Sequence, residues 1–207
     1  MSLVVIENGI VKQSLTMAEH DDTKHTLPFS GNLLKILQAN SMSDTAPANT
    51  TLTRNLSAGT ITLSINNAAS KEVGTVQSEK IAPSGLPRIL TFRITSVSGL
   101  DSHTTVRIGF MNAAATHYAW IAYNPATSQW TASNKGGGAE TSDNTDITTN
   151  KIFSIYLTNG RVTFVKPPGV IISHITNLPT DPLGYIIWVL TDGTAASPSI
   201  TLDYFGY

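Results

Sequence analysis

Apolar and polar residues alternate along much of the chain, and this alternation predicts strands. Every second residue is apolar in residues 59–66, and the same pattern runs through residues 88–97 and 105–111. A period of two gives a strand one face for a core and one face for solvent. Such segments recur about every ten residues with turn residues between them, which is typical of a sandwich or a barrel.

Three local patterns add detail to this prediction. The pair Asn159-Gly160 stands between two apolar runs, which predicts a two-residue hairpin turn, and Asn8-Gly9 predicts a hairpin within residues 1–17. Residues 185–190 lack polar alternation, so we expect a central strand covered on both faces. Residues 32–39 fit a helix and a strand about equally well, since three leucines share one helical face.

The remaining segments suggest how the chain is divided. Residues 40–55 are rich in Ser, Thr, Ala, Asn and Pro and predict a linker or a long loop, and residues 82–87 form a turn-rich boundary. Residues 135–150 are rich in Gly, Thr and Asp and predict a mobile loop. We therefore expect an all-β fold, with an N-terminal arm at 1–55 and an antiparallel β-sandwich at 56–207.

Composition supports strands and excludes several kinds of partner. Only 13% of residues are charged, against roughly 25% in typical soluble domains, so the surface must consist mainly of Thr, Ser and Asn. The formal net charge of −1 gives no basic surface for nucleic acid or for an anionic membrane. A chain with so little charge also repels its own copies weakly, which favours burial in an assembly.

Cysteine usage and hydropathy narrow the class further. The chain has no cysteine, which excludes disulfides, thiol catalysis and cysteine zinc sites. Residues 1–9 lack the charged and apolar regions of a signal peptide. The longest apolar runs are far too short to span a membrane, so no membrane partner is expected.

No catalytic constellation is evident in the sequence. No G-x-S-x-G elbow is present, and the five histidines are scattered along the chain (His20, His25, His103, His117 and His174). Glycoside hydrolysis requires two carboxylates roughly 5–10 Å apart, but Glu140 and Asp143 fall in the predicted loop and Asp203 is isolated. We therefore expect no catalytic residue and no enzyme activity.

Oxygen-rich segments raise the question of a metal. Residues 143–146 carry oxygen ligands at short spacing, as calcium loops do, but lack the glycine and the distant glutamate of an EF-hand. A turn is the simpler interpretation, and calcium near Asp143 and Asp146 stays an open alternative. The histidines and aspartates of residues 20–25 predict a solvated loop. No metal and no cofactor are expected.

Aromatic residues flanked by amides suggest carbohydrate binding. Trp120, Tyr123 and Trp130 lie close together in sequence, and aromatic faces stack on sugar rings. Trp120 is expected to fill the core, whereas Tyr123 and Trp130 either bind sugar or cover the edge of the core. The candidate carbohydrate-binding residues are therefore Tyr123, Trp130, Asn124 and Asn134.

Six segments of the second half, separated by turn residues at regular intervals, resemble the strands of a known family. They are Val106-Arg107-Ile108-Gly109-Phe110, Tyr118-Ala119-Trp120-Ile121-Ala122-Tyr123, Phe153-Ser154-Ile155-Tyr156-Leu157, Val162-Thr163-Phe164, residues 185–191 and Ile200-Thr201-Leu202-Asp203-Tyr204. Their rhythm over residues 88–207 resembles the concanavalin A-like lectin/glucanase jelly roll of the kind found in virion proteins of tailed phages. Two features depart from that family: Lys166-Pro167-Pro168-Gly169 replaces its usual turn, and the acidic catalytic signature of its glucanases is absent.

The resemblance implies a jelly-roll sandwich in a non-enzymatic virion protein: a head fibre, spike, decoration or tail-fibre subunit. It implies a homo-oligomer, commonly a trimer, whose arm docks on other virion proteins and whose sandwich contacts host glycans. The protein would be assembled into the virion in the host cytoplasm. The alternatives are a stand-alone carbohydrate-binding module and, less favoured, a glycan-degrading enzyme.

Overall fold

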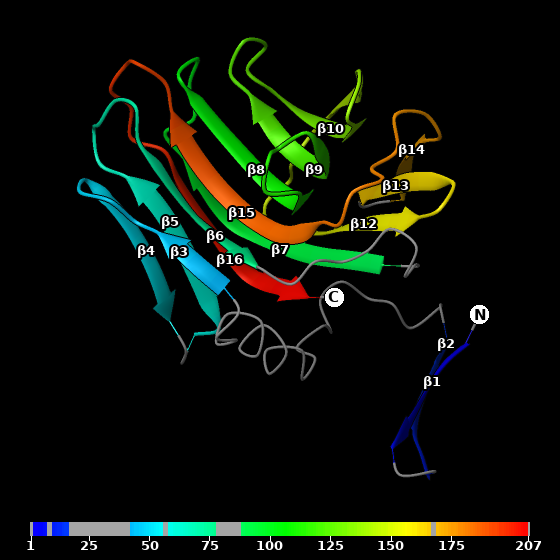
Figure 1. Ribbon diagram of the computed structural model, residues 1–207. Coiled ribbons are helices and arrows are strands. Elements are labelled where there is room, and N and C mark those ends of the chain that lie inside the picture. Colours follow the sequence, from blue (N-terminus) through cyan, green and yellow to red (C-terminus); the bar gives the residue numbers. More distant parts are fainter. Residues whose placement is uncertain are drawn as a thin grey trace.

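Two antiparallel sheets packed face to face form the body of the protein (Figure 1). The computed structural model describes residues 2–7, 10–16, 42–55, 58–77, 88–166 and 169–206. The described residues contain strands but no helix, and therefore no helix long and apolar enough to cross a membrane. The predicted all-β sandwich is confirmed.

Each sheet has seven strands. Sheet 1 has the order β11-β10-β9-β8-β15-β6-β3, with bounds Glu140–Thr145, Gln129–Gly136, His117–Asn124, Thr104–Met111, Gly184–Thr191, Glu72–Gln77 and Met42–Thr45. Sheet 2 has the order β14-β13-β12-β7-β16-β5-β4, with bounds Val170–His174, Arg161–Lys166, Ile152–Thr158, Arg88–Ser98, Ser199–Gly206, Thr60–Ile65 and Thr50–Asn55.

A separate hairpin precedes the sandwich in sequence. β1 (Ser2–Glu7) pairs with β2 (Ile10–Thr16), and the register shifts between Val5 and Ile6. This pairing confirms the hairpin predicted around Asn8-Gly9. The helix-or-strand alternative at residues 32–39 and the boundary at 82–87 lie outside the described residues.

The core lies between the inner faces of the two sheets because alternate residues of each strand point inward. Phe92 of β7 and Phe153 of β12 occupy paired positions, and their rings stack with centroids 5.7 Å apart. In sheet 1, the rings of Phe110 on β8 and Tyr185 on the neighbouring strand β15 have centroids 5.1 Å apart. These rings are buried among a larger number of Ile, Leu and Val side chains, and the burial of this apolar surface stabilises the sandwich.

Several strand predictions are confirmed by this architecture. The alternating segment at residues 59–66 forms β5, and the turn at Asn159-Gly160 connects β12 to β13. β15 lies between β8 and β6 in sheet 1. Its side chains are buried on both faces along most of its length, as the absence of polar alternation predicts.

Two polar segments differ from their predictions. Residues 42–45 and 50–55 form β3 and β4, the edge strands of sheets 1 and 2, so the described sandwich begins at Met42 and not at residue 56. The predicted mobile loop at 135–150 contains β11, the other edge strand of sheet 1. Edge strands tolerate polar and charged residues because much of their surface faces water, so their composition is similar to that of a loop.

An ion pair connects the two sheets at the β3–β4 side. Arg54 of β4 binds both carboxylate oxygens of Asp44 on β3 and donates to Thr75 of β6 at 3.3 Å. The Arg54 guanidinium holds the pKa of the Asp44 carboxyl below its usual range. This contact therefore stabilises the fold only while Asp44 is ionised.

The Asp44 ion pair predicts a loss of stability in acid. A carboxyl whose folded pKa is lowered stabilises the protein above its unfolded pKa, about 3.9, and this contribution is lost as the pH falls through the folded pKa. Because the pair is partly exposed, we expect a loss of about 1 kcal/mol or less. Urea unfolding of the wild type and of Asp44→Asn at pH 7 and pH 3 should show a smaller pH dependence in the variant.

Candidate functional site

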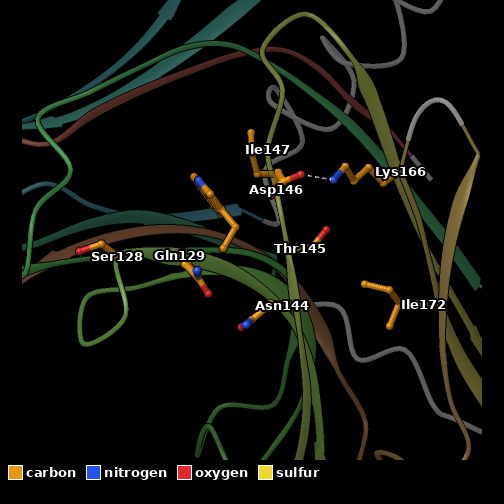
Figure 2. A pocket seen from close by; sticks show the side chains of 9 residues that line it. Ser128, Gln129, Asn144, Thr145, Asp146, Ile147, Lys166 and Ile172 are labelled. Atoms are coloured by element: carbon orange, nitrogen blue, oxygen red, sulfur yellow. Dashed lines mark hydrogen bonds and ion pairs between the residues drawn. The ribbon is translucent and has the colours of Figure 1, made fainter.

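A cavity of about 390 Å³ opens on the side of the sandwich where β11 of sheet 1 faces β13 and β14 of sheet 2 (Figure 2). Trp130 of β10 and Ile172 of β14 face inward by strand alternation, and Ile147 follows β11. These three residues give the cavity its apolar surface. The Trp130 ring is held edge-on by Tyr123, with centroids 5.7 Å apart and an interplanar angle of 67°.

Polar groups border this apolar surface. Lys166, at the end of β13, donates from Nζ to Asp146 Oδ2 at 2.6 Å, and Figure 2 shows this bond beside Ile147. The Lys166 side chain is mostly buried, whereas the Asp146 side chain is exposed. The bond joins β13 of sheet 2 to the segment that follows β11 of sheet 1. Gln129 and Asn144 border the cavity and are exposed residues. Each of them neighbours an inward-facing residue on its strand, so their amides lie at the outer rim of the cavity. The cavity thus combines an indole with amides, a carboxylate and an ammonium group.

A buried histidine network closes the sandwich on the same side. His174 of β14 lies with Nε2 2.9 Å from Asp143 Oδ2 and with Nδ1 against Asn134 Oδ1. Asn134, whose side chain is fully buried, donates from Nδ2 to the backbone carbonyls of Thr176 at 2.9 Å and Asn177 at 2.7 Å. Both ring nitrogens of His174 are engaged, so the ring is a structural connection between the sheets and not a free base.

A second apolar cluster lies on the outer face of sheet 1. Tyr118 and Trp120 stack with ring centroids 3.6 Å apart, and the Arg107 guanidinium lies 4.7 Å from the Trp120 ring centroid. Burial raises the pKa of the Tyr118 hydroxyl and lowers the pKa of Arg107. Trp120 is buried as expected, but in this cluster and not between the sheets. These rings therefore offer no exposed face to a ligand.

The four candidate carbohydrate residues have different surroundings. Trp130 lines the cavity. Tyr123 and Asn134 are buried in the sandwich interior, where a sugar cannot reach their side chains. Asn124 is half-buried at the end of β9, where its Oδ1 accepts a hydrogen bond of 3.0 Å from the backbone N–H of Ala126. The structure therefore places only Trp130 at the cavity.

Lys166, Ile172 and Ile147 of the cavity were not singled out by the sequence pattern. Lys166 and Ile172 come from sheet 2, far along the chain from Trp130. Their separation in the sequence gives no sign that they lie near β10, because the packing of sheet 2 on sheet 1 is what brings them to Trp130. The amide of Gln129, next to Trp130 in sequence, is the residue whose local context could have indicated the site.

The oxygen-rich residues 143–146 do not converge on one point. Asp143 points inward to His174, and Asp146 pairs with Lys166. Asn144 lies next to Asp143 on β11 and so projects from the opposite face. Within the described part of the chain, no group of three or more His, Asp or Glu residues could hold a metal ion.

Carboxylates on the outer face of sheet 1 are far apart. Among the described residues, Glu72 of β6 and Glu140 of β11 project from that face, and four strands separate them. Five strand steps of about 4.8 Å place them roughly 24 Å apart along the sheet. A glycoside-hydrolysing pair requires about 5–10 Å.

Comparison with known proteins identifies the fold. No family model matches the chain, and no curated protein matches it in sequence. A Bacillus licheniformis β-glucanase superposes with a TM-score of 0.59 at 7% identity, over 80% of this chain and 92% of that one. The Crh5 transglycosylase in complex with NAG gives 0.56 at 10% identity, over 83% and 81% of the two chains. A pseudo β-1,3-glucanase of Mycobacterium tuberculosis gives 0.51 at 10% identity, over 70% and 73%.

These similarities establish the class of fold. The chain has the concanavalin A-like lectin/glucanase jelly-roll fold. At such low identity the match shows the fold alone, so any function must be argued from the site itself.

Proposed function

We propose that this protein is a non-catalytic carbohydrate-binding sandwich whose glycan site is the cavity between β11 and β14. The observation that supports this proposal is the composition of the cavity, where Trp130 and Ile172 are bordered by exposed amides and by the Lys166–Asp146 pair. Its volume of about 390 Å³ falls within the range of small-molecule sites, roughly 300–1,000 Å³.

Each part of the cavity has a role in this proposal. A sugar ring presents a C–H face that stacks on an aromatic ring, which is the part assigned to Trp130. Its hydroxyls both donate and accept hydrogen bonds. At the outer rim, Gln129 and Asn144 can do the same, while Asp146 accepts and Lys166 donates at the cavity. A cavity of this size holds one or two sugar units, and the ion pair fixes two of the polar partners in advance.

The arrangement of carboxylates supports a non-catalytic role. Asp146, the carboxylate that lines the cavity, is paired with Lys166 at 2.6 Å. Hydrolysis in this class of enzyme needs an acid and a second carboxylate across the scissile bond. Among the similar structures are glucanases and a pseudo-glucanase, so this fold is compatible with both active and inactive proteins.

Removing the indole should abolish glycan binding. For a glycan first identified on an array, we expect Trp130→Ala to weaken the Kd measured by calorimetry at least tenfold, or about 1.4 kcal/mol. Because Trp130 also packs on the core, Asn144→Ala and Gln129→Ala serve as variants that leave the core intact, each with a severalfold loss.

Thr53→Ala on β4, at the opposite side of the sandwich, is the matched control and should bind like the wild type. Unchanged affinity in Trp130→Ala, or no hit on an array of diverse glycans, would contradict the proposal. Release of reducing ends from a bound polysaccharide would instead favour an enzyme.

A virion structural protein is the second candidate, and the β1–β2 hairpin favours it. In the described residues this hairpin forms a sheet of its own, which leaves it free to dock on another virion protein. In this proposal the sandwiches form a homotrimer that contacts host glycans. Deleting residues 1–16 should then prevent incorporation into particles, as measured by co-sedimentation with virions, while leaving glycan binding unchanged.

A further inference from the structure

The ion pair at the cavity joins a largely buried cation to an exposed carboxylate. Lys166 Nζ donates to Asp146 Oδ2 at 2.6 Å, and Figure 2 shows the two side chains pointing toward each other. The Lys166 side chain retains 17% of its accessible surface, whereas the Asp146 side chain retains 82%. The two partners therefore differ in how easily each returns to water.

This difference makes Asp146 the partner that a ligand can replace. An exposed carboxylate keeps most of its hydration, so it gains little from an ion pair. A buried ammonium group has lost much of its hydration and needs an anion close by. If another carboxylate takes the place of Asp146, the charge of Lys166 stays neutralised while Asp146 turns toward water at little cost.

The other charges around the cavity do not provide a substitute for Asp146. In the described part of the chain, the charged residues that line the cavity are Lys166 and Asp146. Asp143, three residues earlier in the chain, is bound to His174 Nε2 at 2.9 Å and does not line the cavity. Once Asp146 turns away, the cavity therefore carries one positive charge, which attracts an anionic ligand.

We propose, on the basis of the glycan site proposed above, that the cavity selects acidic sugars of the uronic acid class, whose carboxylate replaces Asp146 as the partner of Lys166. The C–H face of the sugar ring stacks on Trp130, and the carboxylate of the same ring accepts a charge-assisted hydrogen bond from Lys166. In the free protein, Asp146 occupies the position that the ligand carboxylate takes in the complex.

Calorimetry with oligosaccharides of galacturonic, glucuronic and mannuronic acid, and with their methyl esters, tests this selection. Esterification removes the charge and keeps the ring and its hydroxyls, so each acid and its ester form a matched pair of ligands. For the full chain, we expect at least one acid to bind about tenfold more tightly than its ester. The affinity for this acid should fall as the salt concentration rises, whereas the affinity for the ester should change little.

Two isosteric substitutions should shift the affinity for the acid in opposite directions. Lys166→Met removes the ammonium group and keeps the length of the side chain, so the preference for acid over ester should disappear. Asp146→Asn removes the competing carboxylate and should tighten the binding of the acid about threefold. Arg161→Gln is the matched control, because it removes one positive charge from an exposed position on the same strand, outside the cavity, and should leave the preference unchanged.

The outcomes distinguish the selection of acidic sugars from the glycan site itself. Binding of neutral glycans that depends on Trp130, with no preference for acid over ester, would overturn the selection and leave the glycan site in place. A preference that Lys166→Met retains, or that Arg161→Gln removes, would also overturn it. Weaker binding of the acid by Asp146→Asn would contradict the replacement of Asp146. If neither these ligands nor a diverse glycan array bind, both proposals are wrong.

Discussion

Replacing Asn134 by alanine is expected to lower the free energy of unfolding by about 3 kcal/mol. The substitution removes two hydrogen bonds to the carbonyls of Thr176 and Asn177, and it leaves His174 Nδ1 facing an empty space. Because Asn134 is fully buried, water does not readily replace these partners. Urea unfolding followed by tryptophan fluorescence measures the loss.

Asn144→Ala on the adjacent strand is the control for this prediction. Its amide is exposed, so its removal should change stability by less than about 0.5 kcal/mol. A loss below about 1 kcal/mol in Asn134→Ala would mean that the carbonyls find other partners. The histidine network would then contribute little to closing the sandwich beside the cavity.

Gly136→Ala is expected to cost a similar amount, about 3 kcal/mol, for a steric reason. A Cβ at Gly136 would lie 2.1 Å from the backbone oxygen and 2.8 Å from the carbonyl carbon of Leu178. No rotamer change relieves a clash with the backbone, so the segment that Asn134 holds would have to move. For a chain of this size the loss corresponds to a fall of about 10 °C in Tm, measurable by circular dichroism.

Gly138→Ala is a closely matched control, two positions along the chain. A Cβ there meets nothing within 4 Å, so its Tm should remain close to that of the wild type. Equal Tm values for the two variants would show that the backbone at Leu178 moves to accept the added Cβ without a loss of stability. A large loss in Gly136→Ala alone would confirm that the segment after β14 is fixed against β10.

The central strands could be predicted from the sequence, whereas the edges could not. β5 and β7 each have one buried side and one more exposed side, and that contrast produces a visible period of two. β4 and β11 bury few side chains. Like β3, they are composed largely of Thr, Ser, Asn and Asp. Composition alone cannot separate such a strand from a loop, because backbone pairing and not side-chain burial holds it in place.

The candidate site was predicted only in part, and the reason lies in β9 and β10. Residues 118–123 of β9 are buried on both faces, so alternation cannot show which side of Tyr123 or Trp120 meets the core. Residues 131–134 of β10 are buried in the same way, which conceals the inward direction of Asn134. Trp130 was found because an aromatic residue beside amides indicates a sugar site wherever it points.

The position of β16 has a consequence for the synthesis of this protein. β16 is the last described strand along the chain, yet it lies in the middle of sheet 2 between β7 and β5. Thr62 and Thr201, which are 139 positions apart, share a hydrogen bond of 2.9 Å across β5 and β16. On the ribosome, sheet 2 therefore remains two separate pieces until residues 199–206 emerge. Such late long-range closure slows folding and leaves strand edges open to neighbouring nascent chains during translation.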